Sequence, residues 1–249
     1  MLFRRPKTPA LQSGDVVDVA GCRVRLRVHA RSSRISLKID ARERLVVATA
    51  PTLRRLGDAV VFAESRVDWM AAQLARLPEP ERFLPGKIIR VDGRIVRLEK
   101  AAMRITARLK PGSGEEPARL IASGEDEAFG RAVVRLLKKI ATERLIERTA
   151  HYAARLNQPM PTVAIADARG RWGSCRKAHG AHPAAIRYNW RLILAPPDVL
   201  DYVAAHECAH LIEANHGPDF WALNQDLHPG VKQAKAWLKA NGARLHSAG

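Results

Sequence analysis

The stretch AAHECAHLIEANHGPDFW, residues 204–221, holds three histidines whose spacing suits a metal site. His206 and His210 are four residues apart, so on a helix both imidazoles project from one face, one turn apart. Two histidine ligands need this spacing to share one zinc ion at ~2.0–2.1 Å. Glu207 follows the first histidine, where a carboxylate can take a proton from a water at the open position of the metal. The pattern therefore predicts a zinc site with a catalytic base, although an amphipathic helix with two exposed histidines has the same spacing.

A zinc site of this kind needs a third protein ligand. Glu213 shares the helix face of His206, but seven residues at 1.5 Å each place it ~10 Å farther along a straight helix. His216 can reach the ion if the helix ends first and the chain turns back. Asn215 tolerates the left-handed conformation of such an ending, and Pro218 prevents the helix from continuing. We therefore predict that His216 is the third ligand.

The complete pattern, H-E-x-x-H-x-x-x-x-x-H, has the histidine spacing of the metzincin motif, with Glu213 where that motif has glycine. Three histidines and a water form the catalytic type of zinc site, whereas a structural site is closed by four protein ligands. Weaker candidates for the third ligand are His228, Asp219 and Asp226.

The elements that must position these residues divide the chain into a strand-rich N-terminal half and a helix-rich C-terminal half. Residues 16–50 alternate in the manner of strands, and two β-rich runs flank a turn at Asp92-Gly93. A long amphipathic helix is expected from Glu125 to about Leu156. The predicted fold class is therefore α+β, with a strand-rich region at 1–124 and a hydrolase domain at 125–249, where the motif helix packs beside a small sheet. No internal repeat is evident.

Composition limits the classes of protein and partner. The 249 residues carry a formal net charge of +17, and residues 155–191 hold seven basic side chains against one acidic. This charge favours an anionic substrate or nucleic acid, although a solvated basic surface would account for it equally well. Aromatic residues make up only 5%, which weakens a base-stacking surface. No apolar run approaches the ~20 residues of a membrane span, and three scattered cysteines favour a reducing cytoplasm.

Several motifs in fixed order resemble the YgjP-like metallopeptidase family, which is related to the SprT and WLM zincins. They are RWGSC at 171–175, YNWRLILAP at 188–196, DYVAAHECAHLIEANHGPDFW at 201–221 and AWLK at 236–239. The close resemblance covers about residues 160–240. It implies zinc on His206, His210 and His216, with Glu207 as catalytic base. It also implies a zincin-like core in which strands beside the metal helix line the cleft.

Three arginines fall in the strands expected beside that cleft, namely Arg171, Arg187 and Arg191. Each can hold a substrate carboxylate or phosphate, or can simply pack its stem with a solvated head group. We expect a zinc-dependent hydrolase, in first place a metallopeptidase. Two alternatives stay open, a metal-dependent phosphoanhydride (nucleotide) hydrolase and a basic nucleic-acid-binding module with a vestigial metal site.

Overall fold

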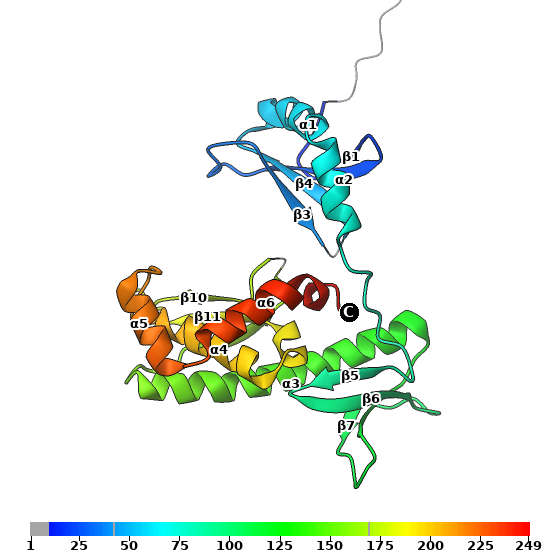
Figure 1. Ribbon diagram of the computed structural model, residues 1–249, viewed down its shortest axis with the longest axis vertical. Helices are drawn as coiled ribbons and strands as arrows, with labels where there is room; N and C mark the ends of the chain where they lie inside the picture. Colours follow the sequence, from blue (N-terminus) through cyan, green and yellow to red (C-terminus); the bar gives the residue numbers. More distant parts are fainter. Residues whose placement is uncertain (1–9, 42, 169) are drawn as a thin grey trace, which may run out of the picture. The chain divides into compact units, whose positions relative to one another are not determined.

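The computed structural model describes residues 10–41, 43–168 and 170–249. The chain forms two compact units, residues 1–78 and residues 79–249 (Figure 1). Each unit has its own hydrophobic core.

The first unit is a four-stranded sheet with helices that follow its last strand. The strand order is β1-β2-β4-β3, in which β2 and β4 are parallel and the outer pairs are antiparallel. Alternate residues of β2 and β4 are buried and pack against the helices. The elements are β1 (Val16–Val19), β2 (Cys22–Val28), β3 (Ser36–Asp40), β4 (Leu45–Ala50), η1 (Leu53–Arg55), α1 (Leu56–Glu64) and α2 (Val67–Ala75).

The second unit begins with another four-stranded sheet, of order β5-β6-β8-β7. A tight turn at Asp92-Gly93 joins β5 to β6, and both turn residues have positive φ, as the favoured two-residue hairpin turn requires. This confirms the predicted hairpin. The strands are β5 (Ile88–Val91), β6 (Arg94–Lys100), β7 (Arg108–Lys110) and β8 (Ala118–Ala122).

The rest of the second unit is a long α-helix, a small sheet, a short 3-10 helix and three further α-helices (Figure 1). The three-stranded sheet has the order β10-β11-β9, so β10 is an edge strand. Helix α4 packs against α3, α6 and β10. The elements are α3 (Asp126–Arg155), β9 (Thr162–Ala166), β10 (Gly173–Arg176), β11 (Ala185–Asn189), η2 (Trp190–Leu194), α4 (Pro197–Ala209), α5 (Pro218–Leu227) and α6 (Val231–His246).

The expected class is confirmed at this level: the protein is a mixed α+β chain with sheets in its N-terminal half and helices in its C-terminal half. Helix α3 matches the predicted helix within a residue at each end. The compact units divide after Pro78, however, and not after residue 124. The physical reason is that the sheet of β5 to β8 shares one core with α3 and α4, through residues such as Leu98, Leu120 and Phe129.

No helix in the described part of the chain combines the length and the apolar composition that a membrane span requires.

Candidate metal centre

Helix α4 is held in place by a buried apolar face and by polar contacts with α3. Val203, Ala204 and Ala205 are buried in the core of the second unit. Asp201, on the first turns of α4, forms an ion pair with Arg148 and accepts a hydrogen bond of 2.7 Å from the Tyr152 hydroxyl, both on α3. These contacts fix the helix that carries the motif.

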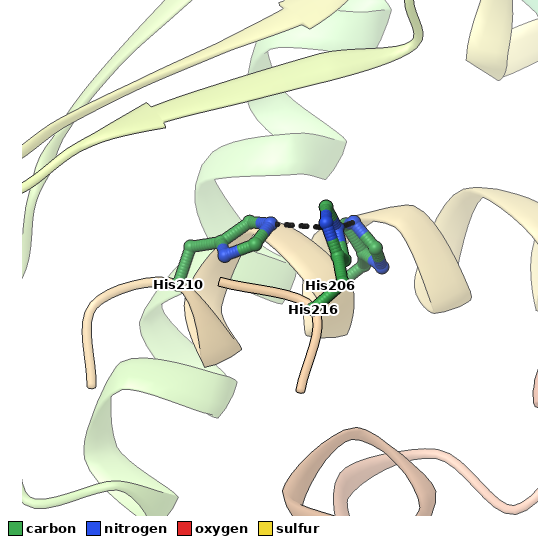
Figure 2. A group of neighbouring side chains, drawn as sticks. All are labelled: His206, His210 and His216. Carbon is green, nitrogen blue, oxygen red and sulfur yellow. Dashed lines mark hydrogen bonds between the residues drawn. The ribbon is translucent and has the colours of Figure 1, made fainter. Parts of the chain in front are cut away.

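Three imidazole rings converge beside the end of α4 (Figure 2). His216 Nε2 lies 3.1 Å from His206 Nε2 and 3.1 Å from His210 Nε2. The ligand atoms of all three rings lie within 4.8 Å of one another. His206 and His210 come from α4 and its C-terminal cap, whereas His216 comes from the segment that leads to α5. The structure thus brings together the three histidines that the spacing singled out.

The chain turns back earlier than we expected. Helix α4 ends at Ala209, and His210 caps it in a right-handed conformation. The expectation that a left-handed Asn215 ends the helix is wrong, because Asn215 has no positive φ. Glu213 instead turns its carbonyl oxygen to His210 Nδ1, at 2.9 Å. The backbone of Glu213 therefore orients a ring, and the segment after it carries His216 back to the helix.

The Nδ1 atoms of His206 and His210 point away from the cluster and contact groups that orient the two rings. His210 Nδ1 donates to the Glu213 carbonyl, which leaves the lone pair of its Nε2 directed at the other rings. His206 Nδ1 lies 3.2 Å from Asn224 Nδ2 and 3.4 Å from the Tyr202 hydroxyl. Asn224 is fully buried, and its Oδ1 is without a hydrogen-bond partner among the described residues.

Phe220 of α5 forms an apolar support for the cluster. It is fully buried, and its ring centroid lies 4.9 Å from that of His206, 4.5 Å from that of His210 and 4.7 Å from that of His216. A ring in contact with all three imidazoles restricts their rotation, so the site is preorganised by packing as well as by hydrogen bonds.

The donor set fits a zinc ion. Ligands at ~2.0–2.1 Å from a tetrahedral centre are separated by roughly 3.3–3.4 Å, close to the 3.1 Å separations of His216 Nε2 from the other two Nε2 atoms. Lone pairs that face one another repel unless a proton or a cation lies between them. Burial lowers the pKa of His206 to about 3, and the charges of His210, His216 and Lys235 contribute in the same direction. Neutral His206 therefore has its nitrogen free for a metal at neutral pH.

Glu207 lies on the β10 side of α4 and is 5% exposed. Its carboxylate lies directly over the backbone of Gly173: a Cβ atom at Gly173 would be 2.4 Å from Glu207 Oε1. Burial raises the pKa of Glu207 to about 7, against the opposing charge of Arg171. A carboxyl with a pKa near neutrality, on the residue that follows His206 in α4, suits general acid–base chemistry.

The structure places the three candidate arginines differently. Arg171 precedes β10 and lies near Glu207. Arg187 is exposed on β11, opposite Ser174 of β10. Arg191 is 1% exposed, pairs with Asp167 at 2.5 Å and donates to the Ala248 carbonyl, so it holds the structure together.

The weaker candidates for a metal ligand lie apart from the cluster. In the parts of the chain that the structure describes, only His206, His210 and His216 form a group close enough to share an ion. Asp226 pairs with Arg155, and His228 Nε2 lies 3.9 Å from an Asp201 oxygen.

Three positions in contact with the candidate site residues escape sequence reasoning, namely Gly173, Phe220 and Asn224. Gly173 is identified only by its contact with Glu207, 34 positions later. A glycine in a strand is only weak evidence that another group lies close to the backbone there. Phe220 and Asn224 read as ordinary core positions of α5. The one local signal is their i, i+4 spacing, which places both on the same face of that helix.

The chain was compared with known proteins. It matches a family model described as YgjP-like, metallopeptidase domain, over residues 33–241. Searches against curated proteins and against solved structures found no match. The family implies a hydrolase with a divalent metal, and the histidine cluster lies within the matched range. By this match over most of its length, the chain belongs to the YgjP-like metallopeptidase family.

Proposed function

We propose that this protein is a zinc-dependent peptidase, with His206, His210 and His216 as ligands and Glu207 as general base. The observation that carries the proposal is the convergence of three Nε2 atoms at the end of the helix that also carries the buried carboxyl of Glu207, the residue after His206. A bound zinc ion would polarise the scissile carbonyl and make water a stronger nucleophile near neutral pH. The packing of α4 against β10 supports a zincin-like core. The three cysteines are free, which is consistent with a reducing cytoplasm.

Glu207 performs the proton transfers in this account. Its carboxylate takes a proton from the attacking water, whose oxygen forms a bond with the carbonyl carbon. The same carboxyl then delivers that proton to the amide nitrogen as the C–N bond breaks. A pKa of about 7 lets one group accept and donate in a single cycle. The backbone of Gly173 holds the carboxyl from one side.

The substrate is best accounted for as an extended peptide. β10 is the edge strand of its sheet, and Glu207 lies over the first residue of that strand. A peptide that pairs with the free edge of β10 would run past Glu207 with its carbonyl groups at regular intervals. A phosphoanhydride substrate is the second candidate, since Arg171 lies near Glu207 and can bind phosphate.

An activity panel on zinc-loaded protein tests the proposal. Unstructured peptides and nucleoside triphosphates are offered to the wild type and to Glu207→Gln, and the zinc content of both is measured. We expect peptide cleavage by the wild type and a loss of about 10²–10⁴-fold in the variant, which keeps its zinc. Nucleotide cleavage lost in Glu207→Gln would overturn the peptidase assignment. Salt-sensitive nucleic-acid binding that survives the substitution, with no hydrolysis, would favour the non-enzymatic alternative.

A further inference from the structure

A lysine of α6 lies next to the candidate metal centre. Lys235 Nζ is 4.0 Å from the centroid of the Trp221 ring, and that ring stacks on His216 with centroids 5.7 Å apart. Lys235 also lies near enough to His206 to act on its charge. The Trp221 ring therefore lies under the ammonium group of Lys235, but an indole ring does not neutralise that charge.

Two more cations bracket the edge strand β10. Arg171 lies two residues before Gly173, the residue in contact with Glu207. Lys177 directly follows β10, and its Nζ donates to the Ile212 carbonyl in the segment between α4 and α5. That bond uses one of the three ammonium hydrogens, so two remain for another acceptor.

None of these three cations forms an ion pair in the described structure, although Arg171 lies near the buried Glu207. Among the described residues, Arg171, Lys177 and Lys235 form no salt bridge with Asp or Glu. Glu213 and Asp219 lie on the same segment as His216 but pair with none of the three. A divalent ion held by the three histidines would add further positive charge to this region, which favours the binding of an anionic group there.

Building on the peptidase function, we propose that the substrates are acidic peptides. The peptide lies along β10, with carboxylate side chains held by Arg171 and Lys177 at the two ends of the strand and by Lys235 beside the metal centre. The positions favour a peptide over a nucleotide. Strands rise ~3.3 Å per residue, so the α-carbons of Arg171 and Lys177, which flank the four residues of β10, are roughly 15–20 Å apart. One phosphate chain cannot bridge that distance, whereas an extended peptide spans it and presents side chains at intervals.

The test uses matched peptides with blocked ends that differ only in Glu or Gln at positions flanking the scissile bond. Cleavage is measured with zinc-loaded wild type, and binding is measured by fluorescence anisotropy on zinc-loaded Glu207→Gln. A second pair with a free or an amidated C-terminus separates side-chain recognition from recognition of the terminal carboxylate. We expect the Glu peptide to be preferred about tenfold in both measurements, with little effect of amidation.

Charge reversal identifies the residues responsible. Lys235→Glu is expected to abolish or invert the Glu-to-Gln ratio, and Lys177→Met to reduce it. The matched control Lys110→Glu, on exposed strand β7, is expected to leave the ratio unchanged. The ratio is independent of any general loss of activity, and zinc content is measured for each variant to show that the centre is intact.

The outcomes separate this inference from the peptidase function itself. Equal cleavage of the Glu and Gln peptides, or a preference set only by the free C-terminus, would overturn the acidic-peptide proposal and leave the peptidase standing. Preferential binding of Glu peptides without any cleavage would support the recognition site and contradict the peptidase. Hydrolysis of nucleotides with no binding of acidic peptides would overturn both.

Discussion

Two sheets of this protein have the same topology and lead to different structures. In each, a tight hairpin supplies the first two strands, the second strand pairs in parallel with the fourth, and the third strand lies at the far edge. Both hairpins turn on two residues with positive φ, Ala20-Gly21 at 50° and 81°, and Asp92-Gly93 at 48° and 78°. The sheet of the first unit leads into the short helices α1 and α2, whereas the sheet of the second unit leads into the 30-residue α3.

The long helix makes the difference for function. α3 continues beyond its sheet and contacts α4 and β9. Arg148 and Tyr152 of α3 hold Asp201, and the Thr149 hydroxyl lies 3.0 Å from that of Tyr188 on β11. The first unit has an equivalent sheet without such a platform, and the histidine cluster lies in the second unit. The same sheet topology is thus followed by short helices in the first unit and, in the second unit, by the long helix that supports the histidine cluster.

The largest expected effect separates the stabilities of the two units. Leu56 of α1 and Leu145 of α3 are both fully buried, so replacing either by alanine should lower the free energy of unfolding of its own unit by about 2–5 kcal/mol. Zinc stabilises only the folded state that binds it. Denaturation is measured with and without a metal chelator. Leu145→Ala should shift the unfolding transition of the second unit, which chelator also shifts. Leu56→Ala should shift the unfolding transition of the first unit, which chelator does not affect. If both variants shift the same transition, the comparison of the units fails.

Gly173→Ala tests the contact between the small sheet and the carboxyl of Glu207, the proposed general base. The added Cβ would be 2.4–2.6 Å from three atoms of the Glu207 side chain, so the carboxyl must move. We expect peptidase activity to fall about 10²-fold, because a displacement of about 1 Å is enough for such a loss, while zinc content is retained. Gly57→Ala in α1, where a Cβ meets nothing within 4 Å, is the control in the first unit. An active Gly173→Ala enzyme would show that the position of Glu207 does not depend on β10.

Asn224 tests how the second unit orients a metal ligand. When His206 binds an ion through Nε2, its Nδ1 carries a proton and needs an acceptor. The partnerless Asn224 Oδ1 can supply one if the amide turns over, since amide oxygen and nitrogen exchange places on such a flip. Asn224→Leu should weaken zinc binding by about 10–100-fold, and Asn224→Asp, which keeps an acceptor, should retain most of the affinity in a competition with a chelating dye. Equal losses in the two variants would show that Asn224 acts through packing alone.

The smallest expected effect concerns pH. His246 of α6 stacks on Trp172, with ring centroids 4.0 Å apart, and burial lowers its pKa to about 4, with a contribution from Arg191. As the pH falls, His246 therefore takes up a proton near pH 6.5 in the unfolded chain and only at a lower pH in the folded chain. The contribution of neutral, buried His246 to the stability of the fold is complete above pH 6.5 and is lost as the pH falls toward 4. His246→Phe should remove this loss, about 1 kcal/mol after allowance for partial exposure, seen as a melting-temperature difference that grows below pH 6.5. A difference independent of pH would contradict this account.

Local signals predicted much of the structure. The apolar period of α3, the Asp92-Gly93 turn and the spacing of His206, His210 and His216 each depend on neighbouring residues, and each is found as expected. The expectation of no internal repeat is wrong: the strand order shows one sheet topology twice, and its two hairpins carry similar segments, VAGCRVRL at 19–26 and VDGRIVRL at 91–98.

Non-local contacts decided what the sequence did not predict. Arg191 falls beside the motif strands, but its partner Asp167 and the Ala248 carbonyl make it structural. Gly173 likewise contacts Glu207, which lies 34 residues later in the chain. Such contacts join residues that the sequence shows to be neither neighbours nor partners.

The measurement that most directly tests the central claim is the zinc content per chain, by elemental analysis, of protein purified without a histidine tag or chelators. The wild type should hold about one zinc ion per chain, and His216→Ala should lose most of it. His182→Ala, an exposed histidine in the β10–β11 loop, is the control and should keep its zinc. A wild type that lacks zinc and takes up no added metal, or a His216→Ala variant that binds zinc as the wild type does, would contradict the three-histidine centre.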